Sequence, residues 1–217
     1  MHSLLPDSIT LHSLDSNKKK IIELSDGLFE NSKTINAAYP VKDLLYSFGR
    51  NKVCGLELNN FPNFLRKLQT PTNKIDVASA DILRDRERLV PRYNDFRRAM
   101  LLSPITSFDD LTTDKRLRAS LKRIYSNDIE KLDLLIGTHL ECKMTGCVFG
   151  ETIYQVFLLH TIRRVTNDKF YTTMYNAETY TQFGINYIEE ITFKKLLIKH
   201  YPELSNVIPY NAFGLFS

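Results

Sequence analysis

The chain has 217 residues, of which 43% are hydrophobic and 25% charged, and its formal net charge is +4 at pH 7. These are ordinary values for a globular protein, and they exclude a disordered tail or a fibrous repeat as the main organisation. One hydrophobic core can serve a chain of this length, so a single domain over residues 1–217 is predicted.

Charges and cysteines exclude further classes of protein. Acidic and basic residues alternate, as in the run RDRER at 84–88. Nucleic-acid binding needs a face of uncompensated Lys and Arg, so no nucleic-acid partner is expected.

The cysteines are odd in number and lack zinc-type spacing, which predicts reduced thiols in an intracellular protein. They are Cys54, Cys142 and Cys147. Neither a signal peptide nor a transmembrane segment is predicted.

In chain order, residues 1–40 are predicted to be irregular, because they are rich in Ser, Asn and Lys and carry turn signals at Pro6 and Gly27. Apolar residues at helical spacing predict helices in most of 41–217. The expected helices lie near 41–56 (interrupted at Gly49), 64–68, 76–90, 91–100, 114–125, 128–140, 151–165 and 192–200. Their predicted capping residues are Asp76, Thr113 or Asp114, Asp128 and a Ser/Thr-type residue near 192. The run KFYTTM at 169–174 is expected to be extended, and the fold class is all-α.

No glycine-rich phosphate loop, GxSxG elbow or HExxH pair is present, so the common hydrolases and nucleotide enzymes are disfavoured. The most informative stretch is the apolar run at 149–170. A turn of about 100° per residue places Thr161 and Arg164 on one side of a helix and Arg163 on the far side. The apolar residues on the side of Thr161 are Tyr154, Phe157, Leu158 and Val165.

A guanidinium among apolar side chains needs an anion, and a carboxylate matches its two parallel donors. The Thr161–Arg164 side therefore predicts a pocket for an apolar molecule that ends in a carboxylate, such as a fatty acid. Two other interpretations stay open for Arg164: an ion pair with Glu151 or another acid, or extension of the side chain into solvent.

The positions of the five histidines do not by themselves indicate a metal site. His12 and His200 are expected on the surface, and His139 and His160 are expected to be hydrogen-bonded core residues. Taken without context, His2 is expected to be a disordered terminal residue.

Several motifs, in this order and spacing, resemble the C-terminal part of plant fatty-acid α-dioxygenases (pathogen-inducible oxygenases), which belong to the animal-type haem peroxidase and cyclooxygenase superfamily. They are RDRERLVPRYNDFRR at 84–98, SFDDLT at 107–112, DIEKLDLLIG at 128–137, FGET at 149–152 and RRVTNDKFYT at 163–172. The resemblance spans nearly the whole chain. It implies the C-terminal portion of the animal haem peroxidase-like helical fold.

In that family a Tyr-x-x-His pattern provides the radical tyrosine and the proximal haem ligand, so the resemblance implies that His2 binds the iron of haem b. The tyrosine of the pattern would fall before Met1, which leaves no catalytic residue in this chain. The resemblance also places Thr161 on the wall of the fatty-acid channel. The arginine that binds the carboxylate is Arg163 or Arg164, and the helical wheel favours Arg164.

The implied reaction is a haem-dependent 2-hydroperoxidation of long-chain fatty acids with molecular oxygen and peroxide, in oxylipin biosynthesis, plant defence and the response to oxidative stress. The distal histidine and the calcium loop of the family match nothing in this chain, so the chain is expected to be truncated and inactive alone. Its expected location is the cytoplasm or the surface of a membrane or lipid droplet. Two alternatives remain open: a non-catalytic helical remnant that binds fatty acid or a protein partner, and a generic haem peroxidase acting on small phenols.

Overall fold

The computed structural model describes residues 2–27, 32–70 and 72–217, and these are mainly helical, which confirms the predicted fold class. They form two compact units. Unit 1 comprises the residues up to Leu5 together with Cys54–Val165, and unit 2 comprises Pro6–Val53 with Thr166–Ser217. The single-domain organisation over 1–217 stays a prediction.

Unit 2 contains a β-hairpin where the sequence predicts an irregular segment. Strand β1 (Ser8–His12) pairs antiparallel with β2 (Lys19–Glu23), with Ile9 opposite Ile22. Ile9 and Leu11 alternate with polar residues and point into the core, which is the period-2 pattern of a half-buried strand. The pattern covers only five residues, so the polar composition of residues 1–40 concealed it.

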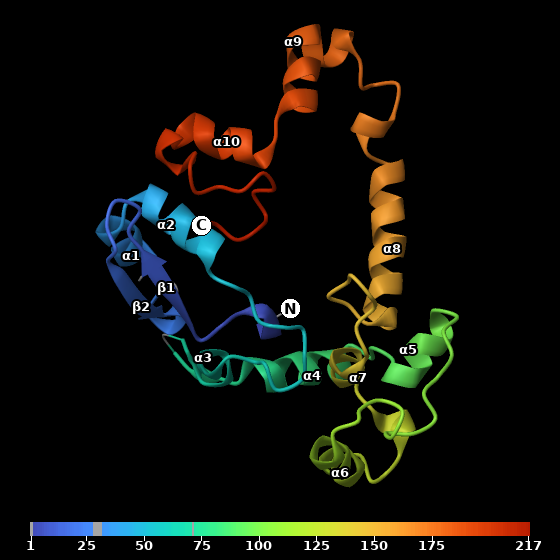
Figure 1. The fold of residues 1–217 in the computed structure, drawn as a ribbon. Coiled ribbons are helices and arrows are strands. Elements are labelled where there is room, and N and C mark those ends of the chain that lie inside the picture. Colours follow the sequence, from blue (N-terminus) through green and yellow to red (C-terminus); the bar gives the residue numbers. More distant parts are fainter. Residues whose placement is uncertain (1, 28–31, 71) are drawn as a thin grey trace. The chain divides into compact units, whose positions relative to one another are not determined.

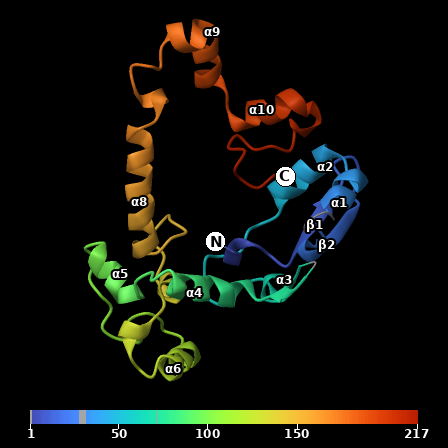
Figure 2. The ribbon, with the colours of Figure 1, turned by 180° about the vertical axis from the view of Figure 1, so that it is seen from behind.

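Side chains of helix α2 (Val41–Arg50) and of Asn51, the residue that follows it, hydrogen-bond to the backbone of this hairpin. The Ser47 hydroxyl accepts from the backbone N–H of His12 at 2.8 Å, and Asn51 exchanges two hydrogen bonds with the backbone of Thr10. These bonds give partners to backbone N–H and C=O groups of β1 on the edge that does not pair with β2, since unpaired strand groups need partners. Both ribbon views show α2 beside the hairpin (Figure 1; Figure 2).

The other described elements of unit 2 are helical. They are η2 (Leu24–Gly27), α1 (Ser32–Ala38), η5 (Lys169–Tyr171), α9 (Ala177–Glu190), α10 (Phe193–His200) and η6 (Pro202–Leu204). One core cluster gathers residues after α10 with Leu197, namely Leu204, Ile208, Ala212 and Phe216. The prediction of an extended segment at 169–174 is wrong, because Asp168 caps a 3₁₀ turn by accepting from the N–H of Phe170.

Unit 1 contains short elements followed by one long helix. They are η1 (His2–Leu4), α3 (Asn63–Arg66), β3 (Leu68–Gln69) paired with β4 (Lys74–Ile75), α4 (Val77–Glu87), α5 (Tyr93–Ala99), α6 (Lys115–Ile124), η4 (Ile129–Lys131), α7 (Leu134–Leu140) and α8 (Glu151–Thr166), whose last residue falls in unit 2. The core of this unit lies between α5, α6 and the η4–α7 segment. Its buried residues are Tyr93, Phe108, Leu111, Leu121, Tyr125 and Leu132.

Local capping signals located several helix starts correctly. The carboxylate of Asp76 accepts from the N–H of Ser79, that of Asp114 from Arg116, and the hydroxyl of Thr192 from Lys195. These side chains satisfy N–H groups that have no partner within the helix.

Three predicted helices are shorter or interrupted in the structure. Helix α2 continues through Gly49, where an interruption was predicted, and ends at Arg50 rather than near residue 56. Helix α4 ends at Glu87 rather than at residue 90, and Leu89 takes a left-handed φ of 55°. The helix predicted over 128–140 is interrupted at Leu132 and Asp133, because the carbonyl of Leu132 accepts from the N–H of Tyr93 at 2.9 Å. Over the described ranges, the structure contains no helix that combines the length and the apolar character needed to cross a bilayer.

Candidate functional site

His2 is held in place rather than disordered, so the expectation of a disordered terminal residue is wrong. Its Nδ1 lies 3.0 Å from Oδ2 of Asp81 on α4, and its ring meets Phe61 edge-on at 5.8 Å between centroids. The carbonyl of Leu4 accepts from the N–H of Cys54, which anchors the short η1 helix. The His2 side chain remains 45% exposed.

This geometry suits an iron ligand. A carboxylate can only accept, so the Nδ1 of His2 donates to Asp81, and in the neutral imidazole the lone pair is then on Nε2. Histidines that bind metals usually donate their second nitrogen to a carboxylate or carbonyl in this way. His2 therefore fits a haem, whose iron its Nε2 would hold as a single protein nitrogen. Within the described part of the chain, no cluster of three His, Cys, Asp or Glu side chains suits a metal ion held by protein alone.

Helix α8 is continuous from Glu151 to Thr166, so Thr161 and Arg164 lie one turn apart on the same side. Thr161 is half-buried, and both Arg163 and Arg164 are exposed. Among the described residues Arg164 has no ion pair. The two cavities beside α4 and α7 are lined by other residues of unit 1. The fatty-acid wall formed by Thr161 and Arg164 stays a prediction.

The first turn of α8 is fixed by a buried network centred on Arg97 of α5, whose side chain is 5% exposed. Arg97 donates to Glu141 at 3.0 Å and to Glu151 at 2.6 Å. It also donates to the hydroxyl of Thr152, whose N–H donates to Glu141. Glu151, a candidate partner of Arg164 in the sequence, is thus paired with Arg97 instead.

Tyr93 completes this network. Its hydroxyl donates to Oε1 of Glu141 at 2.6 Å, and its side chain is fully buried. Burial first, and then the hydrogen bond to Glu141, raise the pKa of Tyr93 well above its usual 10.0. The hydroxyl therefore stays protonated and serves as a donor to a buried carboxylate.

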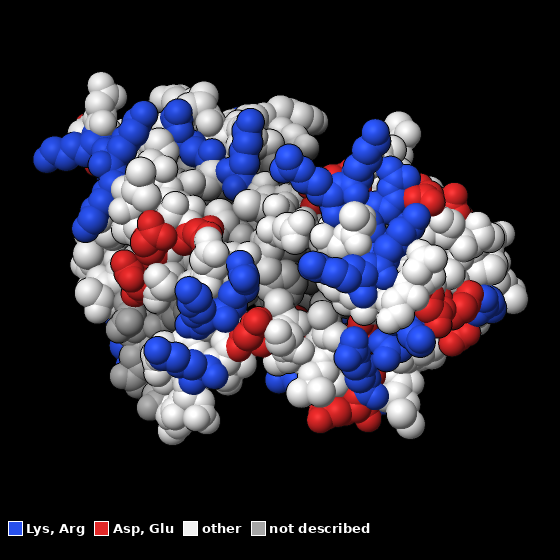
Figure 3. All heavy atoms as spheres, turned by 90° about the horizontal axis from the view of Figure 1, so that it is seen from below, with Lys and Arg blue, Asp and Glu red and all other residues white. Residues whose placement is uncertain are grey.

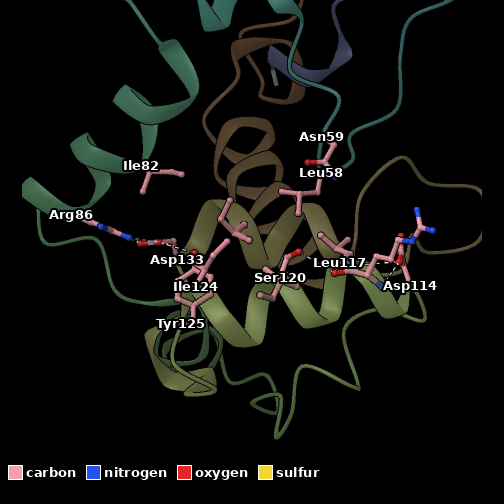
Figure 4. Close-up of a pocket in the computed structure, with 13 residues that line it drawn as sticks. Leu58, Asn59, Ile82, Arg86, Asp114, Leu117, Ser120, Ile124, Tyr125 and Asp133 are labelled. Atoms are coloured by element: carbon pink, nitrogen blue, oxygen red, sulfur yellow. Dashed lines mark hydrogen bonds and ion pairs between the residues drawn. The ribbon is translucent and has the colours of Figure 1, made fainter.

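A cavity of about 590 Å³ lies between α4, α6 and the start of α7 (Figure 4). Figure 4 shows Arg86 reaching Asp133 at one end, where its two donors bind the carboxylate at 3.0 and 2.7 Å. Asp133 also accepts from Arg92 and, at 2.9 Å, from the Tyr125 hydroxyl. Burial and this contact raise the pKa of Tyr125 to about 12. The Asp133 carboxylate is therefore fully paired with donors, and the side chains of Leu58, Ile82, Leu117, Leu121, Ile124 and Ile136 give the cavity an apolar wall.

A second cavity of about 310 Å³ lies beside it and is bordered by Phe61, Leu135 and His139. His139 is buried and its Nδ1 bonds the carbonyl of Leu135 at 2.7 Å, which confirms a hydrogen-bonded core histidine. Burial lowers the pKa of His139. The same prediction is wrong for His160, which is exposed on α8.

Charged side chains are interleaved on the face of the molecule in Figure 3, where Asp and Glu stand among many Lys and Arg. Helix α6 (KRLRASLKRI) is the most basic segment of unit 1, and Asp109 accepts from its Arg118 at 2.8 Å and from its Lys122 at 3.0 Å. These two bonds lower the pKa of Asp109 to about 2. Asp109 therefore pairs with two of the basic side chains of α6.

Sequence reasoning missed Asp81 and Arg97, the two residues that organise this unit. Asp81 is separated from His2 by 79 positions, and Arg97 is 44 positions from Glu141. A polar residue in a helix gives no signal of such a distant partner. The buried position of Arg97 depends on the packing of α5 against α7.

Comparison with known proteins identifies a family and related structures. Residues 1–213 match the family model described as animal haem peroxidase. Alpha-dioxygenase 2 of Arabidopsis thaliana is 35% identical over 95% of this chain, and the match covers 35% of that protein. A crystal structure of the Oryza sativa fatty acid alpha-dioxygenase superposes with a TM-score of 0.92 at 33% identity, over 100% of this chain and 38% of that one. A structure of a variant of that enzyme with palmitic acid gives the same TM-score. The chain thus spans about a third of the length of the curated relative.

Proposed function

Because this chain belongs to the animal haem peroxidase family, we propose that it provides the proximal haem ligand and the fatty-acid-binding helix of an α-dioxygenase-type oxidoreductase. The hydrogen bond between His2 and Asp81 is the observation that carries the proposal. It fixes the one histidine that the resemblance assigns to iron, and it leaves Nε2 as the ligand atom. The relatives named above are fatty acid dioxygenases, and their activity suggests the substrate class.

In this proposal His2 holds the haem iron, and Asp81 orients the imidazole and increases its basicity. Haem, when bound, supplies the oxidising power that this family draws from peroxide. Arg164 binds the carboxylate of a long-chain fatty acid, and Thr161 borders the channel for its first carbons. When Arg164 binds the carboxylate, the carbon next to the carboxylate is the one positioned for hydrogen removal and oxygen addition. The position of the bound substrate thus determines the regioselectivity. The product is a 2-hydroperoxy fatty acid, an oxylipin.

Haemin titration tests the ligand assignment. We expect the purified chain to give a haem Soret shift that is abolished in His2→Ala and weakened several-fold in Asp81→Ala. His200→Ala is the matched control, since His200 is exposed and lies in the other unit. A Soret shift of equal size in His2→Ala and wild type would show that haem binds elsewhere or nonspecifically.

Palmitate binding tests the substrate assignment. We expect Arg164→Ala to weaken binding about tenfold, which corresponds to the loss of one charge-assisted contact of about 1.4 kcal/mol. Arg163→Ala should bind as wild type does, because the helix turns this residue to the far side. No 2-hydroperoxide is expected from residues 1–217 alone, since the resemblance assigns no radical tyrosine to them. Equal palmitate binding by all three proteins would remove Arg164 from the site.

A further inference from the structure

The cavity of about 590 Å³ lies wholly within unit 1, because all of its lining residues fall between Cys54 and Val165. Figure 4 shows Leu58 and Ile82 on the opposite side of the space from Leu117 of α6. Sites for small molecules typically have volumes of about 300–1,000 Å³, mostly apolar walls and a few polar groups that orient the ligand. The cavity has the size and the apolar wall of such a site.

Helix α6, which forms one side of the cavity, carries more positive charge than the described residues around it neutralise. Its sequence, KRLRASLKRI, contains basic residues and no acidic one. Asp109 pairs with Arg118 and Lys122. Arg116 also borders the cavity and is exposed, and its guanidinium forms no ion pair within the described part of the chain.

The other charged groups at this cavity are already engaged. Arg86 binds the Asp133 carboxylate through two hydrogen bonds. Asp114 caps α6, because its carboxylate accepts from the backbone N–H groups of Arg116 and Leu117. Among the described residues that line the cavity, Arg116 is therefore the charged side chain that is left to pair with a ligand.

The second cavity, of about 310 Å³, adjoins the first. The two share Leu58, Asn59, Ile82 and Ile136 as lining residues. One cation and one anion, Arg66 and Glu57, border the second cavity, so these two side chains add no net charge there. The two cavities together favour an elongated apolar ligand whose charged end lies at α6.

We propose that this cavity binds an apolar organic acid, whose carboxylate pairs with Arg116 and whose hydrocarbon part lies against the apolar wall. A carboxylate matches the parallel donors of a guanidinium, and hydrocarbon gains free energy when it leaves water. Thr161 and Arg164 border neither cavity. The site is therefore separate from the predicted wall on α8, and it requires no haem.

Isothermal titration calorimetry of the purified chain with octanoate tests this site. The matched ligand is 1-octanol, which has a hydrocarbon chain of the same length and no charge. We expect Arg116→Ala to weaken octanoate binding about fivefold, the upper end for an exposed ion pair, and to leave 1-octanol binding unchanged. The difference should shrink in about 1 M salt, because screening then reduces the range of exposed charges to about 3 Å.

Two further variants locate the ligand. Arg123→Ala is the matched control, because Arg123 is an exposed basic residue of α6 that does not line the cavity, and it should bind octanoate as wild type does. Ser120→Phe places a large side chain at the cavity wall and should abolish the binding of both ligands. If circular dichroism shows that Ser120→Phe loses helix content, Arg116→Ala still decides, since it changes only an exposed side chain.

The outcomes distinguish this site from the proposed function. The site is overturned if octanoate does not bind wild type, or if Arg116→Ala binds octanoate as wild type does. An equal loss in Arg123→Ala also overturns it, because α6 would then attract anions without a specific site. Octanoate binding that falls in Arg164→Ala but not in Arg116→Ala supports the proposed substrate site and contradicts this one. A loss in Arg116→Ala without any His2-dependent Soret band supports the cavity site and contradicts the proposed function.

Discussion

The first turn of α8 and the turns beyond it belong to one helix, but they differ in burial. Thr152 is buried in a network that α5 and α7 complete, whereas Ile162 is 57% exposed. Propensity and periodicity make both parts helical, so helix formation does not distinguish them. The difference shows that unit 1 provides the partners for the start of α8, whereas the rest of the helix has a core composition without burial inside that unit.

The largest expected effect is the loss of Arg97. Arg97→Ala leaves Glu141 as a buried carboxylate without its counter-charge, and breaking one partner of a buried pair costs about 3–5 kcal/mol. We expect the free energy of unfolding to fall by that amount in urea, followed by circular dichroism because the chain has no Trp.

Arg98→Ala is the matched control for Arg97. Its guanidinium pairs with Asp95 and Glu130, but its side chain is 46% exposed. Exposed pairs contribute about 0–1 kcal/mol. If the two variants lose similar free energies of unfolding, burial does not make the Arg97 network more stabilising than an exposed ion pair.

The sequence predicted those features of the fold that depend on one or two neighbouring residues. Asp76, Asp114 and Thr192 cap helices as expected because a single local hydrogen bond decides each case. The extent of α8 was predicted to within one residue from its apolar-rich stretch. The β-hairpin was missed because five alternating residues are too short a signal beside a polar composition.

The candidate site was only partly predictable. The resemblance identified His2 as a ligand, but its support by Asp81 depends on how α4 packs, and local sequence does not record that. Likewise His160 was expected in a core, since its neighbours are apolar, yet the exposed turns of α8 carry it. Apolar sequence indicates a need for burial and does not specify what provides it.

The second expected effect compares two threonines of α8. Thr152→Val removes a hydroxyl that accepts from Arg97 and donates to Glu141, so we expect a loss of about 1–3 kcal/mol. Thr161→Val should change unfolding by less than about 0.5 kcal/mol, because Thr161 is only half-buried. Equal effects in urea unfolding would mean that the two parts of the helix are equally constrained.

The third effect appears at high pH. The pKa of Tyr93 is raised in the folded state, so its contribution is complete below the unfolded pKa of about 10 and is lost as the pH rises beyond it. Wild type should lose stability between pH 10 and 11 by up to about 1.4 kcal/mol more than Tyr93→Phe does. Tyr171→Phe is the control because this residue is 71% exposed. If the free energies of unfolding of wild type and Tyr93→Phe change in parallel with pH, folding does not raise the pKa of Tyr93.

The smallest effect concerns the exposed turns. Ile162→Ala should alter the free energy of unfolding of the isolated chain by no more than about 0.5 kcal/mol, because the side chain is more than half exposed already. Leu121→Ala, at a core position that is 3% exposed, should cost about 2–5 kcal/mol. If Ile162→Ala costs as much as Leu121→Ala, the later turns of α8 are buried by this chain itself. The contrast between the two ends of the helix would then disappear.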